Sequence, residues 1–249
     1  MEKITSRKNE YIRHVRLLST EAAYRREAKQ YLCDGIKTLR EALGFGAQIC
    51  SVLWKDEARE IPGLSCEKQY IVPADLFDYA SPMKNSPGPL FAVAQPDWKA
   101  EEALSRVLVL EGVQDPGNVG TVIRSANAFG IDAVVLTGDC ADLYNPKTVR
   151  STMGAIFRQR VLRLDVQELS ALLKAHGLPL YGAALAADSV NITELNLKTA
   201  AVAIGSEGRG LSASLLERCD KKLIIPMRPD SESLNAAVAA SVVMWEMAR

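Results

Sequence analysis

A stretch in the second half of the chain, EGVQDPGNVGTVIRSANAFG, combines residues that could do chemistry. It begins at Glu111 at the end of a predicted strand, passes through a glycine-bearing loop and enters a predicted helix. Such helix N-termini bind anions through free N–H groups and the helix dipole. Asn118 near the helix start is a candidate site residue or only a cap. Arg124 lies one turn after Gly120 and projects over a residue without a side chain, which leaves its guanidinium open to a partner. The alternative is an ordinary surface arginine.

A second stretch, NPKTVRSTMGAIFRQRV, leads from Asn145 through a basic segment into small residues. Pro146 and Gly154 frame that segment. Arg150 and the later arginines suit contacts with phosphate groups, and the plain alternative is a solvated basic helix end.

The third candidate joins three short stretches, AIGSEGRGLS, IIPM and SESLNAA, each at the carboxyl end of a predicted strand or at a helix start. Ligands of open α/β sheets bind outside the carboxyl ends of the strands. Three such ends, rich in glycine and serine, can hold a small polar molecule through the main chain. Glu207 and Asn235 add polar anchors, and three ordinary turns are the alternative.

Alternating strands and helices must position these stretches. From Arg106 onward, apolar runs such as RVLVLEG, AVVLTG and AAVAIG alternate with helical segments, which predicts a mostly parallel sheet covered on both faces. The first part is a smaller α/β region, with strands at ICSVLW, KQYIVP and PLFAVAQP, and with helices in EAAYRREAKQYLCDGIKTLREAL. A polar connector follows Gln95, so we expect two domains, residues 1–98 and 105–249.

Composition narrows the function classes. The 249 residues contain no apolar run long enough for a membrane span and no secretory signal at the N-terminus, so we expect a cytoplasmic protein without membrane contact. Five cysteines without a CxxC pair predict free thiols in a reducing compartment. With only two histidines in the sequence, histidine-based metal or triad chemistry is disfavoured, and no metal site is expected.

Local charge favours a nucleic-acid partner although the formal net charge is zero. Residues 1–50 carry ten basic side chains against six acidic ones, and residues 147–163 carry five basic side chains and no acid. Such clusters can contact phosphates if the fold brings them together. A nicotinamide dehydrogenase is disfavoured, because Gly112, Gly117 and Gly120 do not form the G-x-G-x-x-G pattern. A non-catalytic RNA-binding module is the other hypothesis, but it would assign no function to the three polar strand ends.

The three stretches resemble, in order and spacing, the three motifs of the SpoU (TrmH-type) branch of the SPOUT RNA 2′-O-methyltransferases over roughly residues 105–249. The first part, including YLCDGIKTLREAL, is similar to the L30e-like substrate-binding domain often fused in front. The resemblance implies an α/β fold with a deep trefoil knot in the C-terminal SPOUT domain. It also implies S-adenosylmethionine as methyl donor and a homodimer in which the last helix lies at the interface.

The resemblance further implies the site residues. Those matching cofactor-binding positions are Gly205, Ile225, Met227 and Leu234. Those matching active-site positions are Asn118, Arg124, Glu207, Ser233 and Asn235. Arg124 is the family's proposed residue for removing the 2′-hydroxyl proton; because arginine effectively never deprotonates, it could instead clamp the adjacent phosphate. Trp245 would be a buried anchor of the dimer or a core residue within one chain.

The sequence does not identify which RNA is the substrate. The L30e-like domain favours ribosomal RNA by analogy, with transfer RNA as the alternative substrate and a non-catalytic RNA-binding protein as the alternative of another class. One departure from the family pattern is Thr152, where relatives usually have serine, and its role is an open question.

Overall fold

The computed structural model describes residues 1–98, 103–228 and 233–249, which form two compact units. Unit 1 comprises Met1–Asp97 and Asp142–Phe157, and unit 2 comprises Trp98–Ala141 and Arg158–Arg249. The chain thus leaves unit 2 once and returns to it. No helix in the described ranges is long and apolar enough to cross a membrane.

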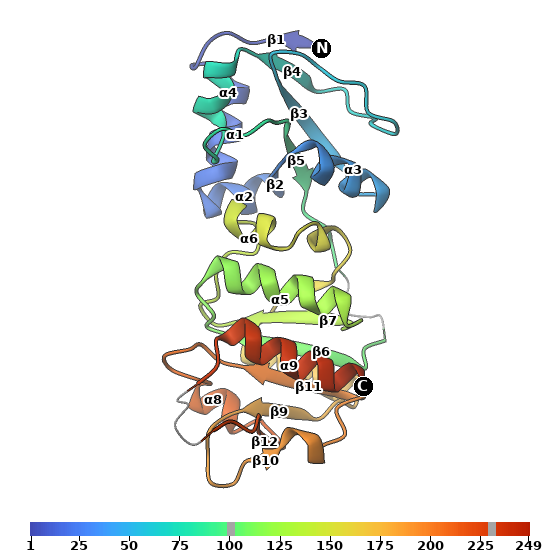
Figure 1. Cartoon of the computed structure of the whole chain (residues 1–249), viewed down its shortest axis with the longest axis vertical. Helices are drawn as coiled ribbons and strands as arrows, with labels where there is room; N and C mark the ends of the chain where they lie inside the picture. The colour runs from blue at the N-terminus through green and yellow to red at the C-terminus, as the bar shows by residue number, and fades with distance from the viewer. Residues whose placement is uncertain (99–102, 229–232) are drawn as a thin grey trace. The chain divides into compact units, whose positions relative to one another are not determined.

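Unit 1 is built on a five-stranded mixed sheet in the order β1-β4-β3-β5-β2 (Figure 1). Its strands are β1 (Glu2–Lys3), β2 (Gln30–Asp34), β3 (Ile49–Lys55), β4 (Gln69–Val72) and β5 (Leu90–Ala94). Its helices are α1 (Glu10–Thr20), α2 (Ala22–Ala28), α3 (Ile36–Gly44) and α4 (Ala74–Ala80). β5 runs antiparallel to β2 and β3, while the remaining pairs are parallel.

Strand β2 corrects the sequence interpretation, which predicts helical segments in the stretch that contains it and no strand. Lys29 ends α2 in the left-handed conformation, with φ of 50°, so the helix cannot continue. Tyr31, Leu32 and Cys33 are then buried on both faces of the sheet. Burial between two layers outweighs the weak helix propensity of the flanking residues.

Unit 2 holds a seven-stranded parallel sheet in the order β10-β12-β9-β11-β6-β7-β8. Its strands are β6 (Arg106–Glu111), β7 (Ala133–Thr137), β8 (Val161–Arg163), β9 (Leu180–Ala183), β10 (Val190–Asn191), β11 (Ala200–Ile204) and β12 (Lys221–Ile224). Its helices are α5 (Pro116–Ala128), α7 (Val166–Ala175), α8 (Ala213–Leu216) and α9 (Ala236–Ala248), with a short 3-10 turn η2 (Ile192–Glu194). The parallel α/β sheet predicted for the second half of the chain is therefore confirmed.

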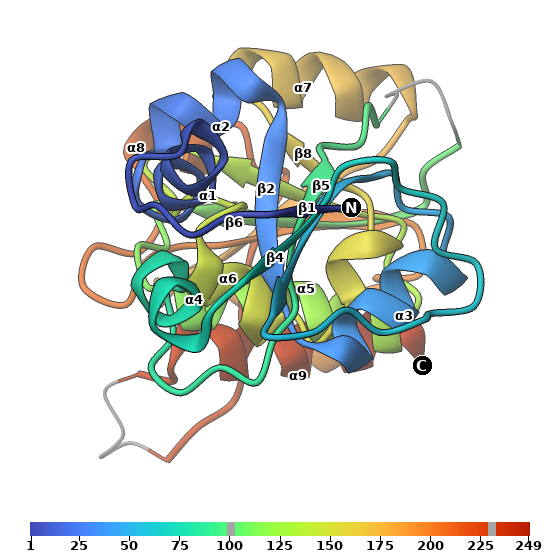
Figure 2. The ribbon, with the colours of Figure 1, turned by 90° about the horizontal axis from the view of Figure 1, so that it is seen from above.

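Helices cover both faces of this sheet. Alternate residues such as Val107, Val109 and Val135 pack in one core cluster with Leu169 of α7 and with Leu215 of α8. The other face carries α5 and α9, which contact each other while α9 also contacts β6 and β11. Figure 2 shows α7 on one side of the sheet and the pair α5 and α9 on the other. Two covered faces explain why the central strands β7 and β11 are buried at every position rather than alternately.

Residues 142–157 depart from the expected partition into domains 1–98 and 105–249. This segment contains α6 (Pro146–Ser151) and the 3-10 turn η1 (Ala155–Phe157), and its contacts assign it to unit 1. Its apolar side chains share a core cluster with residues of β2, β3 and β5; they are Leu143, Tyr144, Val149, Ile156 and Phe157. The local sequence of this segment does not reveal that its apolar side chains pack in the core of unit 1.

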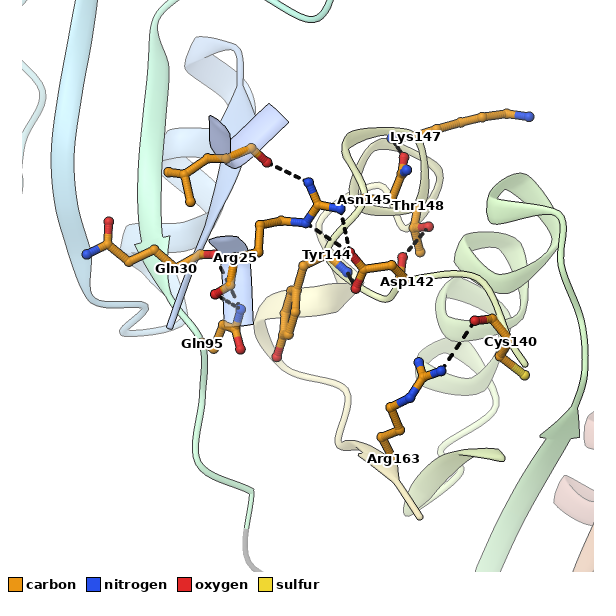
Figure 3. A network of polar contacts seen from close by, with 11 residues as sticks. Arg25, Gln30, Gln95, Cys140, Asp142, Tyr144, Asn145, Lys147, Thr148 and Arg163 are labelled. Carbon is orange, nitrogen blue, oxygen red and sulfur yellow. Dashed lines mark hydrogen bonds and ion pairs between the residues drawn. The ribbon is translucent and has the colours of Figure 1, made fainter. Parts of the chain in front are cut away.

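An ion pair between a buried arginine and a half-buried aspartate attaches the start of this segment within unit 1 (Figure 3). Arg25 of α2 is 2% exposed, and its Nε donates to Oδ2 of Asp142 over 2.9 Å. Its Nη1 donates to the carbonyl of Leu18 over 2.7 Å. The ring of Tyr144 stacks on that of Tyr31 with centroids 4.7 Å apart. The segment is therefore attached by polar and aromatic contacts as well as by its apolar core.

Candidate functional site

A cavity of about 520 Å³ lies in unit 2 at the carboxyl ends of β9, β11 and β12. All four residues predicted to bind a cofactor line it: Gly205, Ile225, Met227 and Leu234. Glu207 and Ser233, predicted for the active site, line it as well. Strand ends far apart in the sequence meet here because a parallel sheet places all its carboxyl ends at one edge.

The loop after β11 forms one wall of this cavity. Ser206 and Gly210 pair across the loop, with the N–H of Gly210 donating to the carbonyl of Ser206 over 2.9 Å. Gly205 packs directly on the backbone of Gly210, so that a Cβ atom at Gly205 would overlap the backbone carbonyl group of Gly210. Only glycine at this position permits the loop to fold so tightly.

Glu111 holds the far end of the same loop. This carboxylate is 8% exposed and accepts two hydrogen bonds of 2.7 Å from Ser212, one from its N–H and one from its hydroxyl. Ser212 in turn caps α8. Sequence reasoning treated Glu111 only as the end of a strand, although an acid that closes an apolar strand was the available signal.

Three predicted side chains meet beside the cavity. Nδ2 of Asn118 donates to Oε1 of Glu207 over 2.6 Å, and Nδ2 of Asn235 donates to Oδ1 of Asn118 over 3.3 Å. Asn235 also lies 3.4 Å from Glu207 and caps α9 by accepting from the N–H of Ala237. The carboxylate of Glu207 faces the N-terminus of α9 and accepts from the N–H of Ala236 over 3.3 Å, where the helix dipole favours negative charge.

Asn118 is more than a helix cap. Asp115 occupies the N-cap position of α5 and accepts from the N–H of Asn118 over 2.9 Å. The side-chain amide of Asn118 is therefore available to join Glu207 and Asn235. The cluster links the starts of α5 and α9 to the loop that lines the cavity.

Arg124 stands apart from this cluster. It is exposed on α5, six residues after Asn118, and forms no hydrogen bond or ion pair with any described residue. Six residues of helix turn a side chain to a different face from Asn118. Within one chain the structure thus assembles four of the predicted active-site residues around the cavity and leaves Arg124 outside.

Thr152 has a local structural role. It is fully buried in unit 1, and its hydroxyl donates to the carbonyl of Val149 over 2.6 Å at the end of α6. The extra methyl group, relative to serine, lies inside a packed region. The departure from the family pattern therefore changes packing rather than a solvent-facing group.

An apolar groove runs along the exposed side of α9. It measures about 500 Å³ and is lined by Phe129, Val238, Val242 and Trp245, among others. Trp245 is 59% exposed and meets Phe129 edge to face, with ring centroids 6.0 Å apart. The expectation that Trp245 is a core residue within one chain is therefore wrong.

Two cysteines of unit 2, Cys140 and Cys219, are not set up as nucleophiles. All five cysteines are free thiols. Burial raises the pKa of Cys219 to about 11, and it also raises the pKa of Cys140 above the ordinary thiol value. Both thiols stay protonated at neutral pH, and thiols react as thiolates. Covalent chemistry through cysteine does not fit this site, and among the described residues no cluster could hold a metal ion.

Known proteins resemble the chain across nearly its full length. Residues 105–245 match the SpoU rRNA Methylase family. The 23S rRNA (guanosine(2553)-2′-O)-methyltransferase RlmP of Bacillus subtilis is 34% identical, over 99% of this chain and 99% of its own. An uncharacterized tRNA/rRNA methyltransferase of Synechocystis is 31% identical, over 99% of this chain and 93% of its own.

Solved structures share the same architecture. An AdoMet-bound rRNA methyltransferase from Sinorhizobium meliloti is 25% identical and superposes with a TM-score of 0.86, covering 98% of this chain and 96% of that one. An RNA 2′-O ribose methyltransferase is 29% identical with a TM-score of 0.79, covering 98% and 97%. Because residues 105–245 match this family and the Bacillus subtilis relative matches nearly the whole chain, the chain belongs to the SpoU rRNA methylase family.

Proposed function

We propose that the chain methylates the 2′-hydroxyl of a ribose in ribosomal RNA, with S-adenosylmethionine as the methyl donor. The observation that carries this proposal is the cavity at three strand ends, because the four residues that match the family's cofactor positions line it together with Glu207 and Ser233. Ribosomal RNA is favoured over transfer RNA because the Bacillus subtilis relative, whose name gives 23S rRNA as substrate, matches the whole chain.

The cavity suits S-adenosylmethionine. Its volume of about 520 Å³ lies within the range of small-molecule sites. Leu211, Leu223 and Leu234 offer apolar surface, and the loop at Gly205 offers a close backbone approach that a side chain would block. We therefore assign Gly205, Ile225, Met227 and Leu234 to cofactor binding.

The active-site residues chiefly position the reacting groups rather than activate the methyl donor. S-adenosylmethionine supplies an already electrophilic methyl group, so the protein must chiefly align it with a ribose oxygen. Asn118, Glu207 and Asn235 fix the loop and both helix starts at the cavity through their mutual hydrogen bonds. Ser233 lines the same cavity. Arg124, whose guanidinium is unpaired among the described residues, binds the phosphate next to the target ribose and polarises its hydroxyl.

A homodimer through α9 would complete the site. The groove around Val238, Val242 and Trp245 is apolar and exposed, which is typical of surfaces that bind a partner. In the proposed dimer this groove is covered by a second copy, and Arg124 of one subunit serves the cavity of the other. Trp245→Glu should therefore produce monomers in analytical ultracentrifugation and lower methyl transfer, whereas an unchanged dimer would rule out this interface.

We further propose that the C-terminal SPOUT domain contains a deep trefoil knot and that unit 1 is an L30e-like RNA-binding domain. The full-length similarity to the Sinorhizobium meliloti and Bacillus subtilis proteins supports both. A cytoplasmic location follows from the ribosomal substrate and from the free thiols of all five cysteines.

The proposal is tested by incubating the protein with unmodified 23S rRNA and methyl-labelled S-adenosylmethionine, followed by alkaline hydrolysis. A 2′-O-methyl group removes the nucleophile that cleaves the next phosphodiester, so the label should remain in alkali-resistant dinucleotides. Label in mononucleotides would indicate base methylation and reject the reaction. Guanosine 2553, named for the Bacillus subtilis relative, is the first position to map.

A further inference from the structure

Two arginine side chains of unit 1 stack on one exposed tyrosine. The guanidinium carbon of Arg16 lies 4.1 Å from the ring centroid of Tyr79, and that of Arg7 lies 4.6 Å from it. Arg16 belongs to α1, Tyr79 belongs to α4, and Arg7 lies in the turn before α1. Cation–π contacts of this kind hold long side chains that would otherwise move freely in water.

The backbone beneath this stack is fixed. The turn that carries Arg7 is closed by a hydrogen bond from the N–H of Asn9 to the carbonyl of Ser6, and Asn9 then caps α1. On the other side, Phe77 and Ala80 bury α4 in the core of unit 1 while Tyr79 stays 38% exposed. The three side chains are therefore presented from rigid elements at the surface.

Among the residues that the structure describes, no acid is paired with either arginine. Neither Arg7 nor Arg16 forms an ion pair with any residue in the described parts of the chain. The acidic residues of α1 and α4 do not pair with these arginines. Asp78 forms an ion pair with Lys55 over 2.8 Å, and Glu10 and Asp75 pair with neither arginine. Two like charges held beside one ring repel each other, and a bound anion would relieve that repulsion.

The chemistry of the stack selects the anion. A guanidinium that rests on an aromatic face keeps N–H donors along its edge, and their planar fork matches the oxygens of a phosphate. Two such forks next to each other suit a polymer with repeated phosphates better than a single small anion. Contacts of this kind set the register of a nucleic acid without reading its sequence.

We propose that Arg7, Tyr79 and Arg16 form a clamp for RNA backbone phosphates, through which unit 1 captures the ribosomal RNA substrate. This inference rests on the proposed function, because that function supplies the polyanion. The clamp acts on RNA affinity and has no part in cofactor binding, since its residues lie in unit 1 and the cavity lies in unit 2.

The test compares two doubly substituted proteins that lose the same charge. Arg7→Ala with Arg16→Ala removes the clamp, and Lys37→Ala with Arg40→Ala removes two exposed cations of α3. Binding to an unmodified 23S rRNA transcript is measured by filter retention between 50 and 200 mM salt. The clamp variant should bind about tenfold more weakly, and its salt dependence should fall in slope by roughly 1 to 2. The α3 variant should bind nearly as the unsubstituted protein does.

Substitutions of Tyr79 test whether RNA affinity depends on the stacked arrangement of the two arginines or only on their positive charge. Tyr79→Phe keeps the ring and should keep RNA affinity, whereas Tyr79→Ala keeps both arginines and should weaken binding. Equal losses in the clamp and α3 variants, or no loss in Tyr79→Ala, would overturn the clamp.

Methyl transfer by the unsubstituted protein distinguishes two kinds of failure. If it methylates 23S rRNA while the clamp variant binds RNA as tightly as it does, only the clamp is rejected. If the unsubstituted protein neither binds nor methylates the transcript although it binds S-adenosylmethionine, the proposed function fails and the clamp fails with it.

Discussion

Replacing Gly205 with alanine should remove most cofactor binding. A Cβ at this position would overlap the carbonyl group of Gly210 and lie 2.5 Å from the N–H of Leu211. These are backbone atoms, so no side-chain rotation can relieve the overlap. The loop that lines the cavity must shift instead.

The size of the effect follows from the cost of that shift. Overpacking by a methyl group costs about 1–3 kcal/mol, and each 1.4 kcal/mol changes an affinity about tenfold. We therefore expect Gly205→Ala to weaken S-adenosylmethionine binding roughly 5- to 150-fold. The backbone of Gly205 does not have a positive φ, so the steric contact is the whole cause.

Gly208→Ala in the same loop is the matched control. No atom lies within 4 Å of a Cβ built at Gly208, and its φ is not positive either. Isothermal titration calorimetry should find near-normal affinity for Gly208→Ala and a large loss for Gly205→Ala, with circular dichroism showing both folded. Equal affinities in the two variants would refute the assignment of this loop to the cofactor.

Three other substitutions test the role of Arg124, the ion pair between Arg25 and Asp142, and the buried carboxyl group of Asp34. Arg124→Ala should abolish methyl transfer to RNA while S-adenosylmethionine still binds, and Arg124→Lys should rescue little because lysine lacks the planar fork; near-normal turnover by either variant would remove Arg124 from the mechanism. Arg25→Ala leaves the carboxylate of Asp142 without its partner, so urea denaturation should find unit 1 destabilised by about 2–4 kcal/mol, and an unchanged midpoint would contradict a stabilising role for the pair. Burial raises the pKa of Asp34, and Oδ2 of Asp34 has no hydrogen-bond partner. A raised pKa means that stability from this group is present at low pH and is lost as the pH rises through that pKa. Asp34→Asn should therefore gain melting temperature relative to the unsubstituted protein between pH 4 and pH 7, and a constant difference would contradict this expectation.

The parallel sheet was predictable from the sequence because its strands are short apolar runs separated by helical segments. β6, β7 and β11 lie where those runs are, since burial on both faces demands apolar residues at every position. The position of the cavity was predictable for the same reason, because the carboxyl ends of parallel strands share one edge. Gly205 and Leu234 line it together although 28 residues separate them in the sequence.

Other features depend on tertiary contacts that no local pattern reveals. From the sequence, β2 resembles a continuation of the preceding helix. It forms a strand because its residues are buried on both faces of the sheet. The packing of residues 142–157 in unit 1 requires the ring of Tyr31 and the guanidinium of Arg25, both more than 100 residues earlier. The role of Glu111 depends on Ser212, which reaches it only after the sheet has formed.

The most direct test of ribose 2′-O-methylation by this protein is nucleoside mass spectrometry of 23S rRNA after incubation with the protein and S-adenosylmethionine. This reaction should give one new 2′-O-methylated nucleoside, formed by the unsubstituted protein and absent with Arg124→Ala. A methyl group on a base, or no new methylated nucleoside from a protein that binds S-adenosylmethionine and 23S rRNA, would contradict it.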